Sequence, residues 1–209
     1  MIKIRDLKRN FKEYNFNIEC RNLTVDKGKS FGIYGDTASG KTLFSMLISG
    51  VIKNYSGSIE IALTELSSTY RKKIGYLPFK NVLYNYMTVK EVSKFLLSQY
   101  KTNKSEFDPK LEWFSQFYNL SQILDRKINS LTDGQLQMAK LFVSLIHSPV
   151  ILIIDEPFNG LGSESVKIIN SVIQSLNYQE VTVLSTSSNR DYLKEITDEI
   201  TTITKGKVE

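Results

Sequence analysis

Cysteine, histidine and long apolar runs are scarce in this sequence of 209 residues. Its single cysteine, Cys20, allows neither a disulfide framework nor a thiol metal site, so the cytosol is the natural compartment. No run approaches the roughly 18 apolar residues that a membrane-spanning helix needs, and the N-terminus lacks the apolar core of a signal peptide. Repeats and low-complexity linkers are absent too. We therefore expect a cytoplasmic globular chain, built as one domain or as one domain with a lobe.

Charge of one sign is not in large excess either. Lysine and arginine together number 27 against 22 for aspartate and glutamate, which gives a formal net charge of +5. A mild excess can favour an anionic membrane surface or nucleic acid, but a solvated, lysine-rich surface accounts for it better. We expect no nucleic-acid partner.

What the sequence does contain is a phosphate-loop pattern. The stretch GDTASGKT, from Gly35 to Thr42, fits G-x-x-x-x-G-K-[ST]. A short apolar, β-prone segment (30–34) precedes it, and residues 43–49 follow with apolar side chains at helical spacing. Strand, glycine loop and helix form the context in which this pattern binds phosphate, because backbone N–H groups curl around the anion at a helix N-terminus. The alternative, a glycine-rich turn with an accidental lysine, does not explain the two flanking segments.

The pattern predicts the roles of individual residues. Lys41 would reach the β- and γ-phosphates of ATP, and Thr42 would offer its hydroxyl to Mg²⁺. The rest of the predicted nucleotide-binding loop consists of Gly35, Asp36, Thr37, Ala38, Ser39, Gly40 and Leu43.

The remaining sequence alternates strand and helix patterns. Residues 2–4 and 16–20 alternate like half-buried antiparallel strands, and further strands are expected at 58–62, 74–78, 150–154, 181–185 and 199–203. The run 150–154 is continuously apolar, which is typical of a parallel strand covered on both faces. Helical spacing is found within 88–129, after 131 and in 166–176, while the polar segment 101–109 is expected to be a loop.

These patterns predict an α/β fold with a P-loop NTPase core. We expect a mainly parallel sheet flanked by helices, antiparallel strands at the N-terminus, and the ligand at the carboxyl ends of the parallel strands. The nucleotide-binding core would comprise residues 1–79 and 131–209, and a small helical lobe would comprise residues 80–130.

The order of motifs resembles the nucleotide-binding domain of the ATP-binding cassette (ABC) family over essentially the whole chain. A phosphate loop alone would also allow kinases, GTPases and helicases. Here it is followed by a strand that ends at Pro78, a helical stretch, LTDGQ (131–135) at the head of a helix, and ILIIDEP (151–157), at spacings like those of the family. The combination of LTDGQ with IIDEP narrows the resemblance to this family.

The resemblance implies a head-to-tail dimer in which each phosphate loop is completed by the partner's LSGGQ-type segment. Thr132, Gly134 and Gln135 would then contact a nucleotide across the dimer. Asp155 would hold the Mg²⁺ shell and Glu156 would polarise the attacking water; the alternative for this pair is a strand-end turn with solvated carboxylates.

The resemblance also suggests an adenine platform. Phe11 lies where the family places an aromatic ring that stacks on the base, an interaction worth about 1–3 kcal/mol. Packing of Phe11 within a hairpin is the alternative.

Four positions depart from the family pattern. Phe79 stands where the family has a glutamine near Mg²⁺ and the water, and Ser187 stands where it has a histidine that contacts the γ-phosphate. The only histidine, His147, ends the LTDGQ helix and is no substitute. Gly162 replaces an aspartate that faces the partner subunit, and Asp133 replaces the first glycine of LSGGQ. Removing one well-aimed donor costs roughly 2.7–4 kcal/mol, so we expect good ATP binding with slow hydrolysis by this chain alone.

The leading hypothesis is an ATP-binding subunit, peripheral on the inner face of the cell membrane, that pairs with a second nucleotide-binding subunit and docks on a separate transmembrane permease. A candidate docking groove contains Phe79, Val82, Leu83, Tyr84, Tyr86 and Met87, although these side chains could equally form the core of the lobe. A second hypothesis is a nucleotide-gated dimerisation module with little turnover. A third, an ABC protein acting on ribosomes or DNA, fits less well because such proteins usually carry two cassettes or a long coiled-coil insertion.

Overall fold

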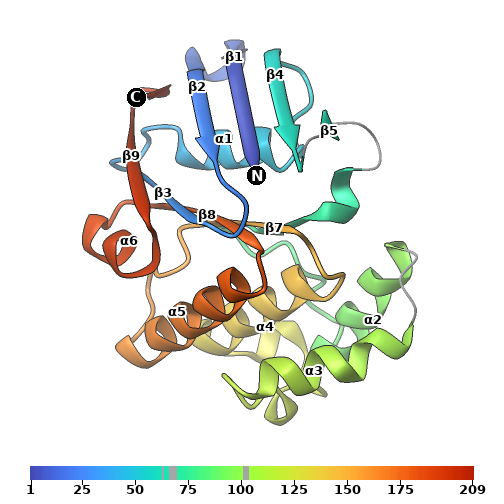
Figure 1. Cartoon of the computed structure of the whole chain (residues 1–209). Helices are drawn as coiled ribbons and strands as arrows, with labels where there is room; N and C mark the ends of the chain where they lie inside the picture. The colour runs from blue at the N-terminus through green and yellow to red at the C-terminus, as the bar shows by residue number, and fades with distance from the viewer. Residues whose placement is uncertain (63, 66–69, 101–103) are drawn as a thin grey trace.

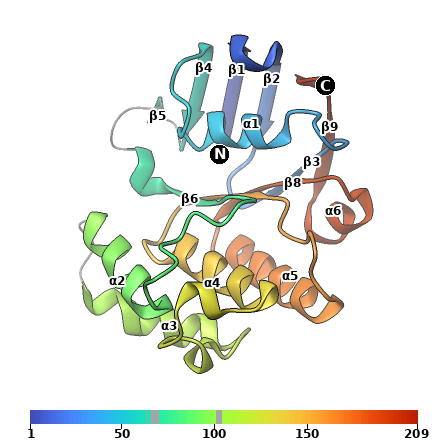
Figure 2. The ribbon, with the colours of Figure 1, turned by 180° about the vertical axis from the view of Figure 1, so that it is seen from behind.

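The computed structural model describes residues 1–62, 64–65, 70–100 and 104–209 (Figure 1). The strands of these residues form one sheet in the order β5-β4-β1-β2-β10-β9-β3-β8-β7-β6. The sheet has an antiparallel part and a parallel part. Figures 1 and 2 show the antiparallel part above helix α1, with the other main helices below the parallel part.

The antiparallel part is built around β1. Its strands are β1 (Ile2–Phe11), β2 (Phe16–Val25), β4 (Ser56–Ile61) and β5 (Thr64–Glu65), and β1 pairs with both β2 and β4. The predicted alternation is confirmed at the start of β1, where Ile2 and Ile4 are buried. Both strands of the hairpin run further than the sequence pattern suggested, and this extension determines the position of Phe11.

The parallel part carries the phosphate loop. It consists of β3 (Ser30–Tyr34), β8 (Thr182–Ser187), β7 (Ile151–Asp155), β6 (Ile74–Leu77) and β9 (Glu199–Thr204). All five residues of β7 are buried, as expected for a strand covered on both faces. The short strand β10 (Lys207–Val208) pairs antiparallel with β9 and parallel with β2, and so joins the two parts.

Helices cover both faces of the parallel strands. Helix α1 (Lys41–Ile48) lies between the two parts of the sheet, and the opposite face carries α4 (Asp133–Leu145) and α5 (Ser163–Tyr178) (Figure 2). The remaining helices are α2 (Val89–Gln99), α3 (Phe107–Ser115) and α6 (Arg190–Ile196), together with the 3-10 turns Lys12–Tyr14, Tyr70–Lys73, Lys104–Glu106, Leu120–Gln122 and Ile128–Ser130. Within the described residues, none of the helices has both the length and the apolar character that crossing a bilayer requires.

The predicted loop at 101–109 is wrong over its second half. Helix α3 begins at Phe107, with Asp108 and Pro109 in its first turn, and residues 101–103 lie outside the described residues. Proline is tolerated there because the first N–H groups of a helix have no intrahelical partner. Phe107 is buried and its ring packs edge-on against Phe142 of α4, so tertiary packing decides where this polar stretch becomes helical.

The predicted helical lobe packs closely on the core. Val92 of α2 and Phe114 of α3 are fully buried in one hydrophobic cluster with Leu141 of α4 and Leu152 of β7. A second cluster fills the space between the antiparallel strands, α1 and the other face of the parallel strands. The division into a core (1–79 and 131–209) and a lobe (80–130) stays a prediction from the sequence, because one hydrophobic cluster contains residues of both.

Candidate functional site

The phosphate loop follows β3 and leads directly into α1. Gly40 has a φ of 107°, and a Cβ atom at this position would lie 2.7 Å from Ile18 Cδ1. Only glycine fits both conditions. Gly40 caps α1 without any side-chain hydrogen bond, so the first N–H groups of the helix point to the loop and are open to an anion.

Lys41 lies at the centre of the loop, with only 6% of its side chain exposed. Its Nζ donates to the carbonyl oxygens of Gly35 at 2.6 Å and Asp36 at 2.9 Å. It also lies 3.2 Å from Oε1 of Glu156. The loop and the carboxylate that follows β7 therefore hold the ammonium group between them.

Asp155 ends β7 and is completely buried. Thr186 Oγ1 donates a 2.6 Å hydrogen bond to its Oδ1, and the Thr42 hydroxyl also bonds this carboxylate. Burial raises the pKa of Asp155, while these two hydrogen bonds oppose the shift. Among the described residues, Asp155 Oδ2 has no hydrogen-bond partner. A buried carboxylate oxygen without a partner, next to a hydroxyl group, is a ligand set that suits a hard cation such as Mg²⁺.

Glu156 has a left-handed backbone, with a φ of 49°. Its N–H donates to Thr186 O at 3.0 Å. Its Oε2 accepts from the hydroxyl of Ser187 at 3.2 Å and from the backbone N–H of Ser188 at 3.1 Å. Non-glycine residues rarely adopt this backbone conformation. The hydrogen bonds from the end of β8 therefore hold both the backbone and the side chain of Glu156 in an arrangement that is otherwise unfavoured.

These groups surround one cavity of about 430 Å³. The predicted residues that line it are Thr37, Ala38, Ser39, Gly40, Lys41, Thr42, Leu43 and Glu156. Its other lining residues are Tyr14, Phe16, Phe79, Asn159 and Ser188. Gly35 and Asp36 contribute the carbonyl groups that hold Lys41, and Asp155 lies beneath the loop against Thr42.

The adenine platform predicted at Phe11 is not supported by its position. Phe11 is only 9% exposed, belongs to the hydrophobic cluster above α1, and pairs with Phe16 across the β1–β2 hairpin. The guanidinium of Arg9 lies 5.4 Å from its ring centroid. Two other aromatic residues near the turn of this hairpin, Tyr14 and Phe16, border the cavity, and the sequence interpretation did not assign them to the base. The hairpin register decides this, because strand alternation turns Phe11 toward the core.

The LTDGQ segment lies away from the cavity of its own chain. Thr132 caps α4 and accepts from Gln135 N at 3.3 Å, while Gln135 Oε1 accepts from Thr132 N at 3.2 Å. Arg126 Nη1 also donates to Gln135 Oε1, at 3.0 Å. Thr132 and Asp133 are exposed, and Gly134 is partly exposed. The three predicted nucleotide contacts of this segment are thus grouped together on the surface, where a second molecule could reach them.

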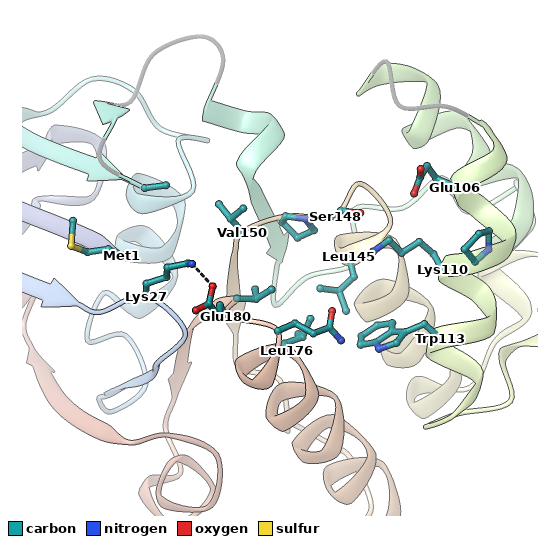
Figure 3. A pocket seen from close by; sticks show the side chains of 15 residues that line it. Met1, Lys27, Glu106, Lys110, Trp113, Leu145, Ser148, Val150, Leu176 and Glu180 are labelled. Atoms are coloured by element: carbon teal, nitrogen blue, oxygen red, sulfur yellow. Dashed lines mark hydrogen bonds and ion pairs between the residues drawn. The ribbon is translucent and has the colours of Figure 1, made fainter.

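A larger cavity, of about 920 Å³, lies where strands β7 and β8 begin, at the ends opposite to the phosphate loop (Figure 3). Val150 and Val181, which directly precede β7 and β8, line it together with α3. Lys110 and the single tryptophan, Trp113, point from α3 toward Leu145 and Leu176, and the Lys27–Glu180 ion pair borders the opposite wall. Among the residues that the structure describes, none lines both this cavity and the phosphate-loop cavity.

Comparison with known proteins identifies the family. The profile of the family described as ABC transporter matches residues 18–159. An uncharacterized ABC transporter ATP-binding protein of Methanocaldococcus jannaschii is 29% identical over 206 residues, which cover 99% of this chain and 75% of that protein. The ABC transporter ATP-binding protein NatA of Bacillus subtilis is 26% identical over 100% of this chain and 87% of its own length.

Solved structures show the same fold. An ATP-binding subunit of an ABC transporter superposes with a TM-score of 0.89 at 22% identity, covering all of this chain and 88% of that chain. A dimeric bacterial ABC transporter cassette gives 0.86 at 22% identity, covering 97% of that chain. The chain therefore belongs to the ABC transporter family, whose members are nucleotide-binding ATPases. The predicted family and the α/β P-loop fold are both confirmed.

Proposed function

We propose that this chain is an ATP-binding subunit of an ABC transporter that binds Mg-ATP at the phosphate loop. The observation that carries this proposal is that Lys41, Asp155 and Glu156 lie together at the N-terminus of α1, although they come from two segments far apart in the sequence. Relatives whose names describe ATP-binding proteins of transporters, including a lantibiotic transport ATP-binding protein of Streptococcus pyogenes, support the assignment.

The lining of the cavity suggests how the nucleotide is held. The loop and the first turn of α1 would surround the phosphates, and Lys41 would exchange its carbonyl and carboxylate partners for phosphate oxygens. Thr42 and Asp155 would hold Mg²⁺, which when bound neutralises charge on the phosphates. Tyr14, with 69% of its surface exposed, and Phe16 would provide the aromatic surface for the base.

A second nucleotide-binding subunit would complete the site. The exposed LTDGQ segment lies outside its own cavity, which is consistent with use across a head-to-tail dimer. The partner could be a second copy or a related chain. In either case Asp133 would bring a carboxylate close to the partner's γ-phosphate, where like charges repel.

Hydrolysis by this arrangement is expected to be slow. Glu156 is positioned to act on water, but Phe79 presents an aromatic ring to the cavity where the family uses an amide. Ser187 bonds Glu156 and does not supply an imidazole. Each missing donor to transition-state charge costs about 10²–10³ in rate. If turnover is absent altogether, the chain is a nucleotide-gated dimerisation module.

A membrane subunit would dock beside the end of β6. Exposed apolar side chains gather there, at Phe79 (44% exposed), Val82 (67%) and Tyr84 (54%). They adjoin a cavity of about 430 Å³ between the end of α1 and helix α2, lined in part by Val51, Val82, Leu83 and Leu96. Tyr84 forms a T-shaped pair with Phe95, with ring centroids 5.5 Å apart, and still has more than half of its surface available to a partner. Phe79→Ala with Tyr84→Ala should abolish co-purification with the permease, and unchanged co-purification would refute this docking surface.

The primary test is ATP binding and hydrolysis by the purified chain, wild type beside Lys41→Ala and Glu156→Gln. Tight binding that is lost in Lys41→Ala, with slow turnover that is lost in Glu156→Gln, supports the proposal. Brisk turnover would show that another group replaces the missing histidine. Binding without turnover, together with an ATP lifetime in the dimer that Glu156→Gln leaves unchanged, favours the dimerisation module. No binding by the wild type would refute the proposed function.

A further inference from the structure

A buried lysine lies on the inner face of the helix that LTDGQ begins. Lys140 of α4 is 6% exposed, and its neighbours Ala139 and Leu141 are fully buried. Its Nζ donates to the backbone oxygen of Phe79 at 3.0 Å and to Oε1 of Gln137 at 3.2 Å. Gln137 is 9% exposed, and its Nε2 donates to the backbone oxygen of Pro157 at 3.0 Å.

The two carbonyl groups belong to the two segments that border the phosphate-loop cavity from this side. Phe79 follows β6 and lines the cavity, while Pro157 directly follows Glu156. Neither Lys140 nor Gln137 lines that cavity. One face of α4 therefore holds both segments by their backbones, although it does not touch the place proposed for the nucleotide.

Burying the charge of this lysine is costly. Burial lowers the pKa of Lys140 to about 8, with the Asp155 carboxylate opposing the shift, so its charge is poorly solvated. Replacing a buried charge by an apolar side chain of similar volume is often neutral or stabilising. A function other than stability is consistent with such a group at this place.

We propose that Lys140 and Gln137 are positioning residues for hydrolysis, which fix Phe79 and Glu156 relative to helix α4. The proposal rests on the proposed function, because it assigns to this pair the alignment of Glu156 for attack on ATP. Helix α4 starts at LTDGQ, the segment proposed to contact a partner subunit. The two side chains therefore connect that segment with Phe79 and Glu156, which border the nucleotide site of the same chain.

The test compares Lys140→Met, Lys140→Arg and Gln137→Leu with wild type, using Lys167→Met on the exposed face of α5 as the matched control. ATP affinity should change less than about threefold in Lys140→Met, whereas single-turnover hydrolysis should fall about tenfold, because misplacement of a reacting group acts on the rate. Gln137→Leu should act in the same direction. Lys140→Arg, which keeps the charge and the donors, should recover part of the rate, and Lys167→Met should behave as wild type.

Two further measurements make the result decisive. Thermal unfolding should show Lys140→Met at least as stable as wild type, so that a lower rate cannot be attributed to unfolding. Amide hydrogen exchange should rise selectively at residues 79–83 and 158–161 in Lys140→Met, and this comparison holds even when wild-type turnover is too slow to measure. Unchanged exchange in these segments, or loss of ATP affinity in proportion to rate, overturns the proposal. Failure of the wild type to bind ATP instead refutes the proposed function.

Discussion

The hydroxyl of Ser187 donates a hydrogen bond to Oε2 of Glu156 across 3.2 Å. The resemblance to the ABC family implies a histidine at position 187, and Ser187 instead hydrogen-bonds the carboxylate that we propose to activate water. Ser187 is 2% exposed and its Oγ also accepts from Asn189 N at 3.1 Å. The hydroxyl therefore orients Glu156, and Ser187 does not line the phosphate-loop cavity.

Restoring the imidazole should raise the rate of hydrolysis. We expect Ser187→His to increase turnover by at least about tenfold, since one well-aimed donor is worth about 10²–10³ and Phe79 remains unsuitable. Phosphate release at saturating Mg-ATP is the measurement. Ser187→Ala is the control, and it should slow turnover further because Glu156 loses a donor. Equal rates in Ser187→His and wild type would show that the missing histidine does not limit this chain.

Two aromatic substitutions should separate nucleotide binding from folding. Tyr14→Ala should weaken ATP binding by about 1–3 kcal/mol and leave stability unchanged, because this side chain is exposed at the cavity. Phe11→Ala should lower the free energy of unfolding by about 3–5 kcal/mol, because it leaves a hole in the core. Titration with a fluorescent ATP analogue and urea unfolding test both. A loss of affinity in Phe11→Ala without loss of stability would reinstate Phe11 as the base platform.

A single methyl group should destroy the phosphate loop. Gly40→Ala would place a side chain in a left-handed backbone and 2.7 Å from Ile18 Cδ1, so we expect ATP binding to fall below detection. Gly162→Ala is a matched control, since among the described residues no atom beyond its chain neighbours lies within 4 Å of the added Cβ, and its φ is −73°. Isothermal titration of the two variants gives the comparison. Normal affinity in Gly40→Ala would mean that the loop is not the binding site.

Acid should destabilise the fold through His147. Its ring stacks on Tyr100 at 3.9 Å, its Nε2–H donates to Ile74 O at 3.0 Å, and burial lowers its pKa to about 4. Below about pH 6.5 the unfolded chain takes up a proton that the native histidine refuses until about pH 4, so stability falls across this interval by up to about 3 kcal/mol. Urea unfolding at pH 7 and pH 4.5 should show a smaller difference in His147→Gln than in wild type. Equal differences would contradict a neutral, buried His147.

The sequence predicts those parts of the site whose chemistry is local. The phosphate loop and the end of β7 are recognisable because glycine, lysine and carboxylate must occur there in a fixed order, next to a buried strand. Helix α4 is predicted for a similar reason, since its capping residues and its apolar spacing are adjacent in the chain.

Contacts between distant residues could not be predicted in the same way. The alternation of β1 does not reveal that the hairpin extends to Phe11, because register depends on how the two strands pair. Lys140 and Phe79 are separated by 61 positions, and only the packing of α4 against β6 brings the ammonium to that carbonyl. The start of α3 at Phe107 depends likewise on the apolar surface of α4.

The place of β3 in the sheet bears on how the protein is made. This strand leads into the phosphate loop, and its neighbours in the sheet are β8 and β9. Strands β10 and β9 lie between β2 and β3. Strands β8, β9 and β10 all lie beyond residue 181 and are therefore synthesised long after β3. The nascent chain therefore carries the loop strand without these neighbours until they have been synthesised, and exposed strand edges of this kind favour aggregation. We therefore expect the phosphate loop to reach its binding geometry only after β8 and β9 have paired with β3.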